Sequence, residues 1–398
     1  MSEVHAAQAP EANVAKLGPA GLLIGVPLLG VSIGLMYLAP DQRVEMAQSY
    51  LFGWVFWAAL TLGCFGLTLL HHTVRGSWGL SILRMLEAGG GPRALSLMAL
   101  LFLPVVGMYG VLYPWADKAR VAADTILQHK SGWINPQMVT GRTFVLFAIW
   151  ALAAAWLRRS SARQDESGDE TEAQKRTNFA APGIVFFVIT VTLAVTDWVM
   201  SLDAHWYSTM FGPLFVVGPA LGALALCTLI VCVNADKSPF NQIMSLSLTK
   251  DLGNMLFTLN LFWAYFNFSQ FIIYWNGNLP TPAGYYFHRS ADGWNFIGGF
   301  LIVFQFLVPF FALMTPRIKA SPRALAWVCG WLILMRFLDV YYIVTPMYRT
   351  TGPMVHWQDI VALLGVGGIW LAAFGSQVKG ASVYPVHDMR LMEAVEHA

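Results

Sequence analysis

The sequence predicts an all-α integral membrane protein with about ten transmembrane helices. Of its 398 residues, 57 % are hydrophobic and only 12 % are charged, whereas an average soluble domain has roughly 25 % charged residues. The apolar residues gather in runs of about 20, the length that a helix needs to cross about 30 Å of hydrocarbon. Tyrosine and tryptophan stand at several ends of these runs, as is typical of the membrane interface.

Ten apolar runs along the chain have the length and composition of a membrane-spanning helix. The fifth and sixth are joined by the short turn SLDAHWYS. An even number of spans places both ends of the chain on the same side. The expected spans cover residues 17–39, 47–70, 94–114, 139–157, 180–201, 207–233, 249–275, 294–315, 322–345 and 357–377.

The chain is therefore predicted to be one polytopic membrane domain, 17–378, between two polar tails, 1–16 and 379–398. Most lysines and arginines between the spans fall on the side of the N-terminus. The positive-inside rule then predicts that both tails are cytoplasmic. Residues 160–176, SSARQDESGDETEAQKR, are charged and poor in apolar side chains, so they are predicted to form a mobile cytoplasmic loop.

A few charged residues lie inside the apolar runs, in the halves predicted to face outward. Charges in hydrocarbon cost on the order of 2.5–3.5 kcal/mol each on insertion scales, so they mark functional or paired positions. Asp197 lies in the fifth span, and Arg336 and Asp339 lie in the ninth. The i,i+3 spacing of Arg336 and Asp339 allows them to pair. Asp197 has no local partner, and Arg336 is one candidate for it.

Four more ionisable residues flank these positions on the predicted outer side. Asp203 and His205 lie in the short turn before the sixth span, and His356 and Asp359 open the tenth. Together with Asp197, Arg336 and Asp339 they could line one outer cavity. Carboxylate and histidine groups can take the two protons released when a quinol is oxidised. The same groups would serve a proton path without a quinone.

On the opposite side, His72 ends the second span and Asp251 opens the seventh. These two residues are candidates for proton entry. A plain structural alternative exists for Asp251, because an acidic residue stabilises a helix N-terminus.

The sequence contains no pattern for a resident metal or redox centre. All nine histidines fall at span ends, in loops or in tails, and there is no CxxCH motif or iron–sulfur cysteine run. If the protein takes part in redox chemistry, a partner must carry the metal centres. A net charge of +2 without a basic stripe gives no indication of nucleic-acid binding.

Three segments resemble a known family. They are TDWVMSLDAHWYSTMFG at 196–212, RMLEAGGGPRALSLMALLFLPV at 84–105 and KDLGNMLFTLNLFWAYFNFSQFIIYWNGNLP at 250–280. Together they resemble the ActF-type membrane subunit of alternative complex III, a bacterial quinol:electron-acceptor oxidoreductase, within the NrfD- and PsrC-like superfamily. The resemblance covers about residues 45–378.

This resemblance implies two four-helix bundles, of spans two to five and six to nine, flanked by spans one and ten. It implies partners in the membrane complex: a multihaem cytochrome, an iron–sulfur subunit and an ActC-like paralogue. The chain would contribute a quinone (menaquinone or ubiquinone) site or a proton path, anchor its partners, and not be catalytic alone.

Two other classes of function remain open from the sequence. Gly212-Pro213 and Gly218-Pro219 fall in the sixth span, and helices broken in this way are typical of secondary transporters. A purely structural membrane anchor would instead have all of its buried charges in satisfied pairs.

Overall fold

The computed structural model describes residues 13–277, 280–379, 382, 384–385 and 388, and this part of the chain is built from helices alone. Ten helical segments are long and apolar enough to cross a membrane, which confirms the predicted fold class. The predicted tails fall largely outside the described residues, namely 1–12 and most of 379–398.

The second to fifth segments form one four-helix bundle. In this bundle α2 packs on α10, α10 on α9, α9 on α4, and α4 again on α2. The third segment begins at Leu83, eleven residues earlier than expected, because 83–91 are buried against α2 and α19. The bounds are α2 (Arg43–Val74), α3 (Leu83–Gly89), α4 (Pro92–Leu100), α5 (Leu103–Gly107), α9 (Pro136–Ser167) and α10 (Thr171–Trp198).

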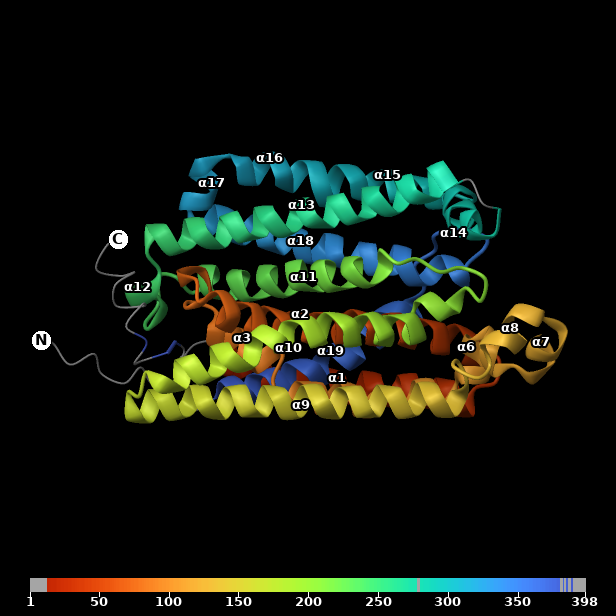
Figure 1. Cartoon of the computed structure of the whole chain (residues 1–398), viewed down its shortest axis with the longest axis horizontal. Coiled ribbons are helices and arrows are strands. Elements are labelled where there is room, and N and C mark those ends of the chain that lie inside the picture. The colour runs from red at the N-terminus through yellow and green to blue at the C-terminus, as the bar shows by residue number, and fades with distance from the viewer. Residues whose placement is uncertain (1–12, 278–279, 380–381, 383, 386–387, 389–398) are drawn as a thin grey trace, which may run out of the picture.

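The sixth to ninth segments close a second bundle in the same way. Here α11 packs on α13 and α18, α13 on α16, and α15 on α18. The two bundles meet where α2 and α10 pack on α11, in the middle of the molecule (Figure 1). The bounds are α11 (Phe211–Val233), α13 (Leu246–Gly277), α15 (Trp294–Leu301), η4 (Ile302–Leu307), α16 (Val308–Met314) and α18 (Pro322–Val344).

The first and tenth segments, α1 (Asn13–Leu38) and α19 (Trp357–Val378), pack on each other and on the first bundle. Their contact is close because glycines face each other across it. A Cβ built on Gly25 would lie 2.7 Å from the carbonyl carbon of Gly368, and one on Gly21 would lie 2.4 Å from the Gly368 oxygen. Small residues that let helix backbones approach in this way are a common means of association in membranes.

Short elements cover the two ends of the bundles. The described chain begins and ends at one end, here called the termini end, where α17 (Pro316–Ala320) and α12 (Phe240–Ile243) also lie (Figure 1). This common end agrees with the predicted even number of spans. The opposite end, here called the loop end, carries α6 (Tyr109–Leu112), α7 (Lys118–Ala123), α8 (Thr125–Lys130) and α14 (Pro280–Ser290).

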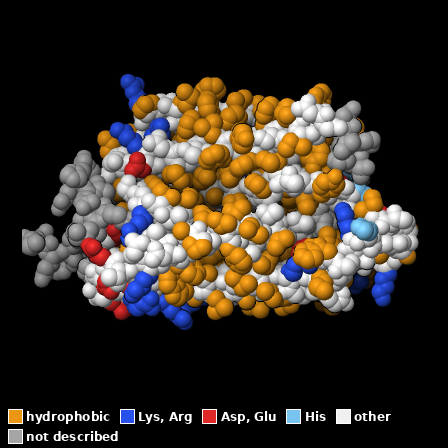
Figure 2. Space-filling model, viewed as in Figure 1, with side chains coloured by type: hydrophobic (Ala, Val, Ile, Leu, Met, Phe, Trp, Pro, Cys, Tyr) orange, Lys and Arg blue, Asp and Glu red, His pale blue; other side chains and the backbone are white. Residues whose placement is uncertain are grey.

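The surface between the two ends is apolar. Figure 2 shows hydrophobic side chains covering the middle of this face, while lysine, arginine and acidic side chains gather at the ends. Exposed large hydrophobic residues such as Leu152, Val185 and Phe268 belong to this belt. A bilayer would cover it.

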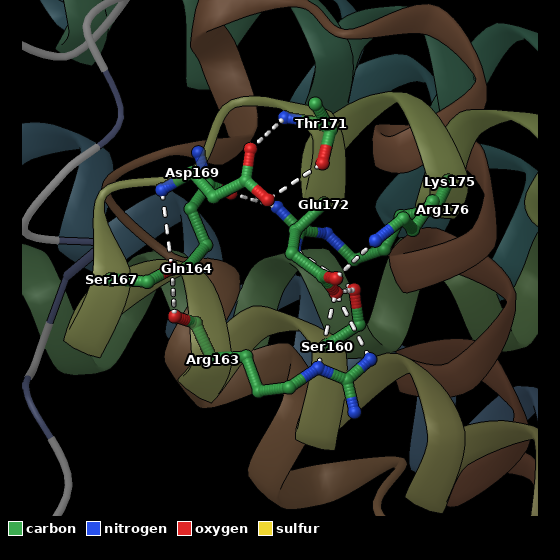
Figure 3. A network of polar contacts seen from close by, with 9 residues as sticks. All are labelled: Ser160, Arg163, Gln164, Ser167, Asp169, Thr171, Glu172, Lys175 and Arg176. Carbon is green, nitrogen blue, oxygen red and sulfur yellow. Dashed lines mark hydrogen bonds and ion pairs between the residues drawn. The ribbon is translucent and has the colours of Figure 1, made fainter.

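The prediction of a loop over residues 160–176 is wrong. Helix α9 continues to Ser167 and α10 begins at Thr171, so a turn of three residues joins them. Polar contacts between the helices explain this: Glu172 of α10 accepts hydrogen bonds from two residues of α9, Ser160 at 2.7 Å and Arg163 at 3.0 Å (Figure 3). Gly168 makes the turn with φ 68°, the left-handed conformation that glycine adopts readily.

The helix breaks expected of a transporter are not at the predicted place. Helix α11 runs without interruption through Gly218 and Pro219. The irregular turn lies instead in the eighth span, where η4 has π-helical bonding immediately before Pro309. Proline has no N–H and its ring clashes with the carbonyl four residues earlier, so a widened turn relieves both conflicts.

Candidate functional site

A cavity of about 610 Å³ lies in the second bundle, between α13, α14, α15, η4 and α18. Its walls are mostly aromatic, and several of its lining side chains are exposed on the apolar belt, including Phe268 (63 %) and Ile302 (60 %). The cavity therefore opens toward the region that a bilayer would cover. Its aromatic lining comprises Trp263, Phe268, Phe271, Tyr285, Tyr286, Phe306 and Tyr342.

The π-helical turn η4 contributes to one wall of this cavity through Ile302 and Phe306. A widened turn frees backbone carbonyls from their usual partners, and in a membrane these groups need new donors. The Asn260 amide donates to the Phe306 oxygen at 3.1 Å, and the Trp331 indole donates to the Phe304 oxygen at 2.7 Å. The irregular wall is thus held in place by side chains from α13 and α18.

Asp339 brings a carboxylate to the wall of the cavity. It pairs with Arg336, one turn earlier on α18, and both side chains are buried. The Trp263 indole also donates to Asp339 Oδ2 at 3.2 Å. The Arg336 guanidinium lies against Gly218 of α11, where a Cβ would stand 2.6 Å from it. The predicted i,i+3 pair is therefore confirmed, and it connects the bundle interior to the cavity.

Arg289 on α14 also lines the cavity. It was not predicted as a site residue, because it lies in a segment expected to be a loop. Its side chain is 2 % exposed. It donates to the backbone oxygens of Tyr285, Tyr342 and Ile343 at 3.1, 3.2 and 2.7 Å. Its guanidinium carbon lies 3.5 Å from the centre of the Tyr285 ring, whose other face stacks on Trp206. Burial raises the pKa of Tyr285, so this phenol is neutral near pH 7.

A short chain of hydrogen bonds connects the cavity lining to the segment before α11. The Gln270 side chain lines the cavity and donates to the Tyr286 hydroxyl at 3.4 Å. Its amide oxygen accepts from the Ser208 hydroxyl at 2.8 Å. Ser208 precedes α11 in the segment that contains the predicted candidates Asp203 and His205.

Asp197, the most prominent candidate from the sequence, does not pair with Arg336. Its carboxylate makes two bonds with Arg142 of α9, from Nε to Oδ2 at 2.8 Å and from Nη2 to Oδ1 at 2.9 Å. Arg142 also donates to the Trp133 oxygen at 2.9 Å and lies over the Trp133 ring. Asp197 is 2 % exposed, and it is not among the residues that line the cavity. Its geometry is that of a structural ion pair.

Asp203 and His205 lie together at the loop end, and neither is among the residues that line the 610 Å³ cavity. Asp203 accepts a hydrogen bond from the His205 backbone N–H at 3.1 Å and lines a separate cavity of about 250 Å³ beside Lys130. The His205 ring contacts Asp124, the N-cap residue of α8, with a distance of 2.8 Å between His205 Nε2 and Asp124 Oδ2. Burial lowers the pKa of Lys130 more than the neighbouring carboxylates raise it. These contacts join the α7–α8 region to the segment before α11.

His356 and Asp359 form the capping box that begins α19. Asp359 is fully buried and accepts from both terminal nitrogens of Arg349 at 2.7 Å and from Ser49 at 2.7 Å. Although burial of Arg349 opposes its charge, the contact with Asp359 raises the pKa of Arg349. These residues join α19 to α2. The structure thus distributes the seven outer candidates over several places, because their partners come from different helices, and only Asp339 lines the large cavity.

The two candidates at the termini end lie on different helices. The Asp251 carboxylate accepts from the Ser77 hydroxyl at 3.1 Å, which ties α13 to the segment between α2 and α3. The His72 side chain is 5 % exposed and its ring lies 5.4 Å from that of His71. A third cavity, of about 290 Å³, lies elsewhere at this end, beside the buried pair of Arg84 with Glu87 and the Arg158 side chain.

Within the described residues, no three histidine, cysteine, aspartate or glutamate side chains gather closely enough to hold a metal ion. The 610 Å³ cavity offers instead an aromatic enclosure with one carboxylate and one guanidinium, which suits a flat organic molecule that has oxygen atoms at its edge. No protein-family model matches the chain, and no curated protein matches it.

Proposed function

We propose that this chain is an integral membrane subunit of a quinol:electron-acceptor oxidoreductase and that the 610 Å³ cavity of the second bundle binds the quinone or quinol. The observation that carries the proposal is a cavity with aromatic walls and the buried carboxylate of Asp339, opening among lipid-facing side chains. Ligand pockets of this size are typically apolar with a few polar groups that fix orientation. A quinone has a flat polar head and an apolar tail, so it fits both the walls and the membrane-facing opening.

The chemistry of quinol oxidation fits the position of Asp339. A quinol loses two electrons and two protons, and a carboxylate within hydrogen-bond reach can accept a proton as general base. The electrons require a carrier outside this chain, because its sequence has no haem or iron–sulfur motif. The resemblance to the ActF-type subunit of alternative complex III supplies the class of partner: a multihaem cytochrome, an iron–sulfur subunit and an ActC-like paralogue. The chain would then act as part of the complex and not alone.

The same proposal includes the orientation in a bacterial cytoplasmic membrane. Arginine and lysine side chains are frequent at the termini end, including Arg93, Arg159 and Lys175, and Figure 2 displays such a cluster on that side. The positive-inside rule favours the cytoplasm for this end. The large cavity would then lie nearer the outer surface.

Gly299 allows a test that leaves the Arg336–Asp339 pair intact. It lines the cavity, and a Cβ built on it would meet no atom of the described residues within 4 Å. In a Gly299→Leu variant we expect the added side chain to occupy cavity space. The matched control is Gly330→Leu on α18, where a Cβ likewise has open space and the cavity is not involved.

The measurement is the isoprenoid quinone extracted from the purified complex, expressed per copy of this chain. We expect Gly299→Leu to lower the quinone content by about tenfold, since filling an occupied site costs on the order of 1–3 kcal/mol. Gly330→Leu should retain the wild-type content. A wild-type complex that carries neither quinone nor haem-bearing partners, or a Gly299→Leu variant with full quinone content, would contradict the proposal.

A further inference from the structure

Arg289 is a buried cation without an acidic partner. Its side chain is 2 % exposed, and among the described residues no carboxylate oxygen lies within the 4.0 Å that defines an ion pair. Other buried arginines of the loop end differ: Arg336 pairs with Asp339, and Arg349 pairs with Asp359. Burying a charge without a counter-charge is costly, so the position of Arg289 calls for a compensating contact.

Backbone oxygens supply part of that compensation. Three N–H groups of Arg289 donate to the oxygens of Tyr285, Tyr342 and Ile343, and the last two belong to the final turn of α18. A guanidinium has five N–H groups, so two remain for another acceptor. Capping the end of α18 explains why a cation is favourable here, but no hydrogen bond to another described residue uses the two remaining donors, and Arg289 lines a cavity.

The helix geometry relates Arg289 to Asp339. Arg289 binds the carbonyls of Tyr342 and Ile343, which follow Asp339 by three and four residues on α18. This separation is about one helical turn, roughly 5 Å along the axis, and both side chains line the same cavity. A ring molecule in this cavity therefore has a donor, Arg289, and an acceptor, Asp339, among the groups that line its site.

We propose that Arg289 donates hydrogen bonds to one ring oxygen of the bound quinone or quinol, while in the quinol the hydroxyl on the opposite side of the ring donates to the Asp339 carboxylate. This inference rests on the proposed function and adds to it the residue that fixes the ring. The Tyr285 ring, held between Arg289 and Trp206, closes the cavity at that side. A charged donor directed at a carbonyl oxygen makes one of the stronger hydrogen bonds in proteins, so Arg289 selects molecules that have such an oxygen over purely aliphatic lipid chains.

The test uses the full chain in nanodiscs and a short-chain 1,4-naphthoquinone as the probe, with binding followed by calorimetric titration. We expect Arg289→Gln to weaken binding by about tenfold, the usual effect of losing one charged hydrogen bond. The control is Arg43→Gln, which removes an arginine that also donates to a backbone oxygen, Met36 O at 2.9 Å, but does not line the cavity. Arg43→Gln should bind the probe as the wild type does.

The outcomes separate this inference from the proposed function. If the wild-type chain does not bind the naphthoquinone, the proposed function fails. If the wild type binds and Arg289→Gln binds equally well, only the role of Arg289 is overturned. Should Arg289→Gln not fold, photolabelling of the wild type with an azido-naphthoquinone decides the matter. Label on the peptide of α14 supports the contact with Arg289, and label confined to other helices refutes it.

Discussion

Replacing Asp197 by asparagine should destabilise the protein without affecting the proposed quinone site. Asp197 and Arg142 share two bonds of 2.8 and 2.9 Å between α10 and α9. Removing one charge of a buried pair costs about 3–5 kcal/mol. Arg142 is 18 % exposed and keeps its contacts with Trp133, so it can be partly solvated after the change. We therefore expect a loss near the lower limit, about 3 kcal/mol in the free energy of unfolding.

A double-mutant cycle isolates this interaction. The variants are Asp197→Asn, Arg142→Gln and both together, unfolded reversibly in mixed micelles with increasing denaturing detergent. Because each single change removes the same pair, the combined loss should fall short of the sum of the single losses by about 2 kcal/mol. Additive losses would refute the reasoning. The folded Asp197→Asn variant should bind naphthoquinone with the same affinity as the wild type. Loss of binding would instead indicate that Asp197 contributes to the binding site.

Two further predictions concern the contact between the bundles and the loop end. Gly63→Ala should lower the free energy of unfolding by about 1–3 kcal/mol, since the added Cβ would lie 2.2 Å from the backbone oxygen of Pro219. The control is Gly30→Ala, where a Cβ has open space. This variant should not be destabilised in the same assay. Asp124 is partly desolvated, yet N–H groups of Leu127 and Ile126 and the ring of His205 hold its pKa below the usual 3.8. The ionised Asp124 carboxylate therefore stabilises the folded protein above pH 3.8, and this contribution is lost as the pH falls below that value. The melting temperature of Asp124→Asn should thus be lower than that of the wild type near pH 6. In acid the two melting temperatures should converge.

The sequence predicted those features that depend on neighbouring residues. Hydrophobic runs define the spans, and the i,i+3 spacing of Arg336 and Asp339 defines their pair, because both signals repeat within one helix. The partner of Asp197 could not be predicted in this way. Arg142 lies 55 residues earlier, and only the packing of α9 on α10 brings the two together.

The error at 160–176 has a related cause. A segment rich in Ser, Glu, Gln and Arg is usually solvated, but here the polar groups satisfy one another between two helices, as Glu172 does with Ser160. Composition alone does not distinguish polar residues that face water from those that face each other. Arg289 was missed for the opposite reason, because a cation in a predicted loop gives no indication that α14 folds over a cavity.

The arrangement of the ion pairs gives a reason to place the site in the second bundle. The last helix of each bundle carries a buried aspartate toward the loop end, Asp197 in α10 and Asp339 in α18. In the first bundle an arginine from another helix takes both carboxylate oxygens of Asp197. In the second bundle the arginine comes from the same helix and binds one oxygen of Asp339, and residues of η4 line the same cavity. A buried aspartate thus joins two helices in the first bundle and lines a cavity in the second. A ligand that needs an acidic acceptor would therefore bind beside Asp339 of α18.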